Sequence, residues 1–330
     1  MNRIEYKVKS VFSRMSLLLY VSVWCLFSGC GDGTGNIAET IDHPQDYAMV
    51  YMRQALDIQA NYTFEMSMKD DTIPLNVNYG GLDYPAKDIT VNFKVAPELV
   101  ATYNLENGTN YPAMPETGYS MDETSVTIPA GKLNSSILKM KVRTAEMLGP
   151  GEHLLPVTIE IASGNVPVNE KMKTAYFLIK GVYNDNPYST FDRTNWTVTA
   201  SSYNNSNAVP QNILDGSVST YWASSFTRKL PQDVIIDMKE IKKLHGFYIS
   251  GRRSSTDSTK PRDSGNPKNL VLETSLDGVN WIYSQPFTLE NLLENALYLD
   301  YFQEARYFKI SINSSHQNMD YAWMVEVNAF

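Results

Sequence analysis

Apolar and polar residues alternate with a period of two along short segments in the first half of the chain. This period is typical of β-strands that bury one face and leave the other in water. Clusters of Gly, Pro and Asn separate the segments at the spacing expected of a β-sandwich. Residues 97–107 instead resemble a short helix, with Pro97 near the start and Asn107-Gly108 at the end. The predicted strands are residues 89–95, 125–129, 138–142, 156–161 and 174–179.

The strand pattern resumes beyond a polar joint at residues 183–188, which contains Pro187. Short strands at regular spacing, with the turn Asp277-Gly278 among them, predict a jelly-roll or related sandwich over residues 189–330. We therefore expect an all-β protein with two β-sandwich domains, the first over residues 47–182. The predicted strands of the second domain are residues 196–200, 233–238, 246–250, 269–275, 281–284, 296–301, 307–312 and 322–327.

The N-terminus has the features of a targeting segment. A basic region ends at Arg14, and the apolar run of residues 15–27 is too short for a permanent membrane span. The run ends in Phe27-Ser28-Gly29-Cys30, which resembles the lipobox of bacterial lipoproteins. The resemblance implies a signal peptide over residues 1–29 and a lipidated Cys30 that begins a tether over residues 30–46. A plain secretory signal, or a signal anchor with an incidental cysteine, is the alternative.

Charge and cysteine content narrow the function classes. The whole chain carries −8 and residues 1–30 carry +3, so the remaining residues carry −11. Phosphate binding needs a basic face, so no nucleic-acid partner is expected. Cys25 and Cys30 are the only cysteines, and Cys25 would be removed with the signal peptide. The mature fold is therefore expected to be stabilised by packing, with no internal disulfide and no cysteine-ligated metal.

Four blocks in the first domain occur in the order found in a known family. They are residues 93–95, 103–111, 126–132 and 154–157. Together they resemble the N-terminal domain of Bacteroidota surface lipoproteins that is catalogued as domain of unknown function 1735. The resemblance implies an immunoglobulin-like β-sandwich that acts as a spacer in glycan-utilisation systems and supplies no catalytic site.

Three blocks in the second domain point to another family. Residues 212–223 contain an Asp-Gly turn followed by Tyr221 and Trp222, residues 274–281 form a strand and a turn ending in Trp281, and residues 325–327 close the domain. They resemble the discoidin domain, also called the coagulation-factor type C domain, and within it the family 32 carbohydrate-binding modules. The resemblance implies a galactose-binding-domain-like jelly-roll with a glycan as its ligand.

A structural calcium ion is implied by the same resemblance. Asp215, Thr220 and Glu326 would supply side-chain oxygens, and the backbone near Asn212 and Ser217 would supply carbonyl oxygens. Calcium is a hard cation that takes six to eight oxygen ligands in irregular loops, so this set is chemically sensible. The alternative is a polar turn that satisfies its own hydrogen bonds, and the residues alone also permit an ordinary β-turn.

The sugar site is expected on loops at one end of the sandwich. An exposed aromatic ring would stack on the sugar, and Arg, His or Asn side chains would read its hydroxyl groups. Trp222 and Trp281 are expected in the core, and Trp323 is left open between core and site. Residues 254–266 either border the site or are simply solvated. By analogy with the family, the candidates are Tyr203, Asn204, Phe226, Arg228, Arg252, Arg253, His316 and Tyr321.

The leading functional hypothesis is a non-catalytic glycan-binding protein, anchored in the outer membrane through Cys30 and facing the cell exterior. The expected partners are a glycan, a starch-utilisation-type porin and its companion binding lipoprotein. A protein-interaction or adhesion module of a surface complex is an alternative, because a fold does not fix a function. An accessory part of a glycoside hydrolase is another alternative, but no stretch is long enough for a catalytic barrel, so no enzyme activity is expected.

Overall fold

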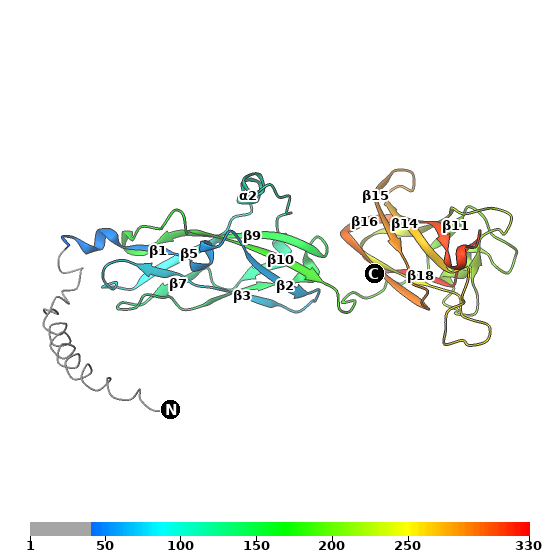
Figure 1. Cartoon of the computed structure of the whole chain (residues 1–330), viewed down its shortest axis with the longest axis horizontal. Helices are drawn as coiled ribbons and strands as arrows, with labels where there is room; N and C mark the ends of the chain where they lie inside the picture. Colours follow the sequence, from blue (N-terminus) through cyan, green and yellow to red (C-terminus); the bar gives the residue numbers. More distant parts are fainter. Residues whose placement is uncertain (1–40) are drawn as a thin grey trace, which may run out of the picture.

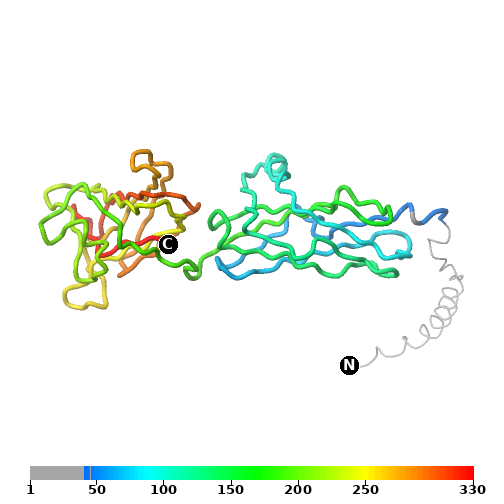
Figure 2. The backbone as a smooth tube through the Cα atoms, turned by 180° about the vertical axis from the view of Figure 1, so that it is seen from behind, coloured from blue at the N-terminus to red at the C-terminus, as the bar shows by residue number. Residues whose placement is uncertain are grey.

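The computed structural model describes residues 41–330, so the signal peptide, Cys30 and most of the predicted tether lie outside the described residues. Two β-sandwich domains lie end to end, as Figures 1 and 2 show from opposite sides. Residues 41–50 lie at the end of the first domain that is far from the second domain, and the C-terminus lies near the joint between them. Within residues 41–330, no helix combines the length and the apolar character needed to cross a membrane.

The first domain pairs a five-stranded sheet, in the order β2-β10-β9-β5-β7, with a three-stranded sheet, β3-β8-β6. A two-stranded ladder, β1-β4, completes it. The strands are β1 (Met49–Tyr51), β2 (Ala60–Glu65), β3 (Asp71–Leu75), β4 (Asn78–Gly80), β5 (Ile89–Val95), β6 (Tyr119–Met121), β7 (Ser125–Ile128), β8 (Leu138–Val142), β9 (Gly151–Ala162) and β10 (Thr174–Val182). Short 3-10 turns lie at Pro44–Tyr47, Arg53–Leu56, Glu116–Gly118, Thr144–Glu146 and Ser163–Asn165.

Alternation along the strands fills the core of the first domain from both sheets. The apolar residues of β5 and β8 point inward and are buried, as the period of two predicts. The predicted helix is confirmed as α2 (Leu99–Asn107), which ends where Gly108 adopts the left-handed conformation, with φ of 65°. Strand β9 does not alternate, because Leu154 on its other face packs against α2 residues Val100 and Tyr103.

The second domain has a six-stranded sheet in the order β11-β13-β16-β14-β15, with β18 also paired to β13, and a two-stranded ladder β12-β17. Its core contains Trp222, which is fully buried as predicted. The same prediction for Trp281 was wrong: this residue begins the edge strand over residues 281–288, is only partly buried, and lies under the Lys309 ammonium, 4.6 Å from its ring centroid. The strands are β11 (Thr197–Ala200), β12 (Trp222–Ala223), β13 (Gln232–Ser250), β14 (Pro267–Ser275), β15 (Trp281–Thr288), β16 (Glu294–Ser315), β17 (Trp323–Met324) and β18 (Glu326–Ala329). Further 3-10 turns lie at Pro210–Leu214 and His316–Asn318.

Strand continuity differs from the sequence prediction. Two pairs of predicted short strands are single long strands, β13 and β16, which stay paired across register shifts near Asp237 and Leu244. Lys239, at the first shift, has φ of 68°, so a local bulge bends the strand without ending it. The predicted strand 322–327 is instead divided, because β17 pairs with β12 while β18 pairs with β13.

An aromatic cluster joins the two domains at the predicted linker. The Tyr188 side chain is buried, and its hydroxyl donates a hydrogen bond to the Ala145 carbonyl oxygen of the first domain at 3.1 Å. The backbone amide of Phe302 donates to the Leu148 carbonyl oxygen at 2.7 Å, which adds a direct contact between the domains. Phe330, the last residue, packs in the same cluster. The joint is therefore packed as a small core of its own.

Candidate functional site

Loops of the second domain gather at the end that lies away from the first domain. These loops follow β11, precede β13 and follow β13, and Figures 1 and 2 both show them at the far end of the molecule. Residues 316–322, which connect β16 to β17, reach the same region through Tyr321 and its contact with Phe226. The arrangement brings residues from four separate parts of the sequence together.

Four aromatic side chains form one cluster there: Tyr221, Phe226, Tyr321 and Trp323. The Phe226 ring is 50% exposed, and its centroid lies 4.5 Å from that of Tyr321. Trp323 lies beneath, only 4% exposed, with centroid distances of 4.9 Å to Tyr321 and 6.2 Å to Phe226. Trp323 was left open by the sequence; it is buried in this cluster rather than in the main core. Phe226 and Tyr321 therefore offer the ring surface that a ligand can reach.

Two arginines lie against these rings. The Arg252 guanidinium carbon lies 3.8 Å from the Tyr221 ring centroid and 4.8 Å from that of Trp323. The Arg262 guanidinium carbon lies 5.0 Å from the Trp323 centroid. Burial lowers the pKa of Arg252, the charge of Arg262 lowers it further, and Tyr221 opposes both effects. A guanidinium remains protonated in proteins, so the cluster carries two positive charges.

Amide side chains fix the positions of the two arginines. The Arg252 amide donates to the Asn266 side-chain oxygen at 2.7 Å, and the Arg262 amide donates to the Arg252 carbonyl oxygen at 2.7 Å. The Asn291 side chain donates to the Arg262 carbonyl oxygen at 2.9 Å, and the Asn266 amide donates to Asn291 at 2.9 Å. The base of loop 251–266 is thus a hydrogen-bonded frame, so this loop borders the site.

Trp323 holds the same loop from the other side. Its indole N–H donates to the Ser264 carbonyl oxygen at 3.0 Å, and its amide donates to the Gly265 carbonyl oxygen at 3.0 Å. Gly265 has φ of 84°, and a Cβ atom there would lie 2.5 Å from the Trp323 ring. Only glycine fits this approach without displacement.

Three of the predicted sugar-site residues lie on neighbouring loops. Tyr203 is 54% exposed but makes no ring contact with the cluster. Asn204 is held by its backbone N–H, which donates to the Ala223 carbonyl oxygen at 2.9 Å. The Arg228 guanidinium donates to the Ser201 carbonyl oxygen at 3.1 Å and is otherwise exposed. These residues can widen the site, whereas the structure brings together Phe226, Arg252 and Tyr321.

The remaining two candidates are engaged elsewhere. The Arg253 guanidinium donates to the Ser258 carbonyl oxygen at 2.7 Å, within its own loop. The His316 backbone bonds to Gly265 and Asn266, while the pKa of its ring is lowered by burial and by Lys268. Sequence reasoning missed Tyr221, Arg262 and the asparagine frame as site residues. Tyr221 stood in a quoted block as a signal, but nothing in the polar composition of residues 254–266 distinguishes Arg262.

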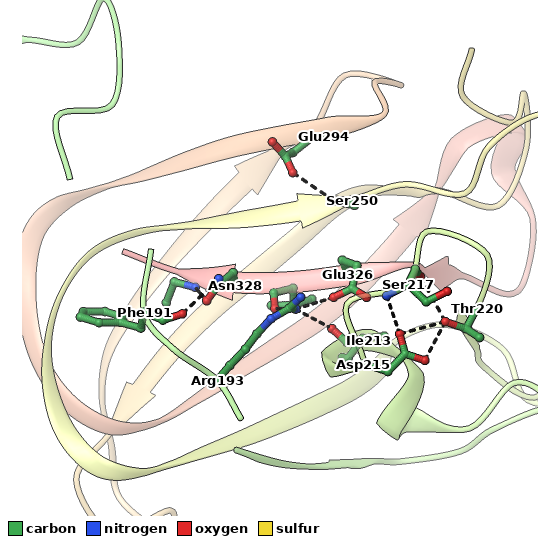
Figure 3. A network of polar contacts seen from close by, with 12 residues as sticks. Phe191, Arg193, Ile213, Asp215, Ser217, Thr220, Ser250, Glu294, Glu326 and Asn328 are labelled. Carbon is green, nitrogen blue, oxygen red and sulfur yellow. Dashed lines mark hydrogen bonds and ion pairs between the residues drawn. The ribbon is translucent and has the colours of Figure 1, made fainter. Parts of the chain in front are cut away.

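The calcium candidates lie together at a second position in this domain. The Asp215 carboxylate accepts the Thr220 hydroxyl at 2.7 Å and the Ser217 amide at 2.8 Å, around the left-handed Gly216 with φ of 79°. Figure 3 shows the Glu326 carboxylate between this turn and Arg193. The Asp-Gly turn is thus partly self-satisfied, and the strand that begins with Glu326 closes over it.

Glu326 was not expected to have an arginine partner. It forms an ion pair with Arg193, which also donates to the carbonyl oxygens of Ile213 at 3.1 Å and Val327 at 2.6 Å. Burial raises the pKa of Glu326, Arg193 lowers it, and the nearby Asp215 raises it again. Two neighbouring carboxylates, Asp215 and Glu326, share one cation, Arg193, so a further positive charge would reduce their mutual repulsion.

The oxygen set at this turn fits a calcium ion. The Glu326 carboxylate is largely buried, with Oε2 in the ion pair with Arg193 and no partner recorded for Oε1, and Asp215 and the Thr220 hydroxyl face the same side. In residues 41–330 no group of three or more His, Cys, Asp or Glu side chains forms a metal site, so an ion here needs hydroxyl and carbonyl oxygens as well. Hard oxygen ligands of this mixed kind are those that calcium accepts.

A hollow in the first domain is lined mainly by apolar side chains. It has a volume of about 550 Å³ and is lined by Tyr47, Tyr51, Leu56 and Met172 among others, with no charged side chain. Recognition of a polar ligand needs convergent polar groups, and the one amide side chain here, Asn169, is already engaged with Met49, Met172 and the Lys171 backbone amide. The loop end of the second domain is therefore the better candidate site.

The folds and the loop-end cluster define a modular protein with a discoidin-type second domain. The profile of the F5/8 type C domain matches residues 197–327, which form most of the second domain. A profile described as an N-terminal domain matches residues 44–166, in agreement with the resemblance found for the first domain. A search of curated proteins finds no match.

Several solved structures align with the chain. A family 32 carbohydrate-binding module from Clostridium perfringens, in complex with GalNAc-β-1,3-galactose, is 19% identical over 43% of this chain and 99% of its own, with a TM-score of 0.38. The C-terminal domain of a Bacteroides fragilis chitobiase is 23% identical over 43% of this chain and 97% of its own, with a TM-score of 0.37. A two-domain protein of unknown function from Bacteroides fragilis is 12% identical over 90% of this chain and 98% of its own, with a TM-score of 0.36.

Proposed function

We propose that this chain is a non-catalytic, lipid-anchored glycan-binding protein of the cell surface. The observation that carries the proposal is the loop-end cluster, in which the half-exposed Phe226 and the partly buried Tyr321 belong to the same ring cluster as the Arg252 guanidinium. Sugars bind through stacking of their apolar face on an aromatic ring and through hydrogen bonds to their hydroxyl groups. The cluster offers both kinds of contact within one site.

The arrangement of the domains supports a surface role. Residue 41 begins the described chain at one end of the molecule, and the loop-end cluster lies at the opposite end. With a lipid on Cys30, the first domain would act as a spacer that holds the sugar site away from the membrane. The resemblance of the first domain to surface lipoproteins favours partners of a glycan-utilisation system, namely a starch-utilisation-type porin and its companion binding lipoprotein.

A binding role fits the carboxylates better than a hydrolytic one. Glycoside hydrolases hold two carboxyl groups roughly 5–9.5 Å apart on either side of the scissile bond. Asp215 and Glu326 are close enough to interact directly, and the Glu326 side chain is 12% exposed and paired with Arg193. This pair is therefore suited to holding a turn rather than to cleaving a sugar.

Calcium at this turn is part of the proposal. Asp215, Glu326 and Thr220 would hold the ion, with the Ser217 carbonyl oxygen as a backbone candidate. The ion would supply a positive charge between two facing carboxylates and tie the turn to β18. Because it would bind only the folded chain, it would stabilise the domain.

A glycan array tests the sugar-binding proposal. The chain from residue 31 onward is applied with calcium and again with a chelator, after circular dichroism has shown that the sample is folded. Binding to a defined glycan class supports the proposal, and weaker binding in chelator supports the calcium site. A folded sample that binds no glycan contradicts the proposal and favours a protein partner in a surface complex.

A further inference from the structure

The two arginines of the loop-end site have no counter-ion. Among residues 41–330, no carboxylate lies within ion-pair distance of Arg252 or Arg262, although both side chains are partly buried. The Nε atom of Arg262 is buried and meets no hydrogen-bond acceptor. A cation that is shielded from water and lacks an acceptor is unfavourable unless a ligand supplies one.

Three other arginines of the described residues, Arg143, Arg193 and Arg306, are neutralised by carboxylates. Arg306 donates to both carboxylate oxygens of Asp237, at 2.9 and 3.0 Å, and Arg143 pairs with Asp70 at 2.6 Å. These are the pairings expected of arginines with a structural role. Within residues 41–330, Arg53, Arg228 and Arg253 lack an ion pair as well, but the first two are exposed to water and Arg253 donates to the Ser258 carbonyl oxygen.

Two carboxylates near the site are engaged with other cations, whereas Asp263, beside Arg262, is exposed to water and forms no ion pair with any described residue. Asp257, in the same loop, pairs with Lys260 at 3.4 Å. Asp320, which precedes Tyr321, pairs with Lys229 at 3.7 Å. The local charge at the two arginines therefore stays positive, in contrast to the net charge of −8 of the whole chain.

We propose that the loop-end site binds an anionic sugar residue, whose carboxylate or sulfate oxygens are held by Arg252 and Arg262 while its ring lies against Phe226 and Tyr321. The inference rests on the proposed glycan-binding function and narrows its ligand class. Guanidinium groups match planar and tetrahedral oxyanions with paired hydrogen bonds, and these two are already positioned by Asn266. Preorganised donors do not have to be ordered when the ligand arrives.

Matched sugar pairs test the inference by isothermal titration. An oligogalacturonate is compared with its methyl ester, and a sulfated galactan oligosaccharide with its desulfated form, so that each pair differs in charge. We expect the charged member of one pair to bind about tenfold more tightly, with a preference that falls as salt is raised. The responding pair identifies the anion as a carboxylate or a sulfate.

Variants locate the effect. Arg262→Gln is expected to lower the affinity for the charged sugar about tenfold and to leave that for its neutral partner nearly unchanged. Lys132→Gln removes an exposed charge from the first domain and is expected to alter neither affinity.

Three outcomes would overturn the inference. Equal affinity for charged and neutral sugars does so while leaving glycan binding intact. A charge preference that survives both Arg262→Gln and Arg252→Gln shows that the anion is read elsewhere. Absence of binding to every sugar, including the array glycans, contradicts the proposed function itself.

Discussion

The two ends of the second domain both carry clusters of aromatic rings and cationic groups, but only one of them is closed. At the end next to the first domain, Tyr183 stacks on Tyr298 with centroids 3.8 Å apart, and Tyr188 stacks on His245 at 3.7 Å. At the distal end, Phe226 is half exposed and the neighbouring arginines have no anion. Composition alone would not distinguish these two clusters.

The difference lies in what satisfies the polar groups. The Tyr188 ring is buried and its hydroxyl donates to a carbonyl oxygen of the first domain, so the polar atom has a hydrogen-bond partner. At the distal end, the guanidinium groups of Arg252 and Arg262 face aromatic rings and no carboxylate. A cluster that is complete within the chain stabilises the fold, whereas the cluster that lacks an acceptor is the one we propose as the ligand site.

Removing Tyr188 should break the closed cluster. We expect Tyr188→Ala to lower the free energy of unfolding by about 4 kcal/mol, because a buried ring and its hydrogen bond to Ala145 are lost together. Chemical denaturation measures the change, and glycan binding should survive it. Tyr84→Ala, which removes a 60% exposed tyrosine, is the control and should cost about 0.5 kcal/mol or less. An equal loss in both variants would contradict the structural role of the joint.

A bulkier residue at Gly265 should damage the open cluster. Gly265→Ala places a Cβ atom against the Trp323 ring in a left-handed backbone, and we expect about 3 kcal/mol of destabilisation with weaker glycan binding. Gly131→Ala is the matched control, since Gly131 has φ of 71° with open space around it. Thermal unfolding and titration of both variants separate the collision from backbone strain. Unchanged binding in Gly265→Ala would show that this loop does not form the site.

Acid should loosen the closed cluster through His245. Burial and, to a smaller extent, the charge of Lys243 lower the pKa of His245 to about 4, against an opposing effect of the Phe330 backbone. Because an unfolded histidine titrates near 6.5, the unfolded chain takes up the proton first, so stability is lost as the pH falls from about 6.5 to about 4. We expect about 2 kcal/mol, allowing for partial exposure.

Denaturation at pH 7 and pH 5 measures this loss. His153 and His316 also have lowered pKa values through burial, so they contribute in the same direction. The informative quantity is the difference between the natural chain and His245→Asn, in which the slope with pH should flatten. A slope that does not change in the variant would assign the acid sensitivity to the other histidines.

Local sequence signals predicted the parts of the site that lie close together in the chain. Asp215, Gly216 and Thr220 form the predicted turn, because its hydrogen bonds need only a few residues. Arg252 was predicted at a strand end by family analogy and lies there. Arg262 was missed because its position depends on Asn266 and Asn291, whose amides join distant loops.

The same limit applies to the fold. Alternation predicted strands such as β5 and β8, where one face is buried against the core and the other is wet. The same alternation predicted two strands in place of β13 and two in place of β16. In β13, the exposed residues around Lys239 resemble a turn, but the ladder with β16 continues past the bulge. Pairing with a partner strand decides continuity, and a single sequence does not record its partner.

The smallest effect we predict concerns the turn of residues 215–220, which belongs to neither of the two aromatic clusters. Thr220→Val keeps the shape of the side chain but removes the hydroxyl that donates to Asp215, which should cost about 1 kcal/mol in chelator. If calcium binds here, the loss should be larger with calcium, because a ligand oxygen disappears as well. Thermal unfolding in both conditions measures the two losses, with Thr72→Val, an exposed site on β3, as the control. Equal losses with calcium and with chelator would mean that the turn is held by its own hydrogen bonds and by the Arg193–Glu326 ion pair alone.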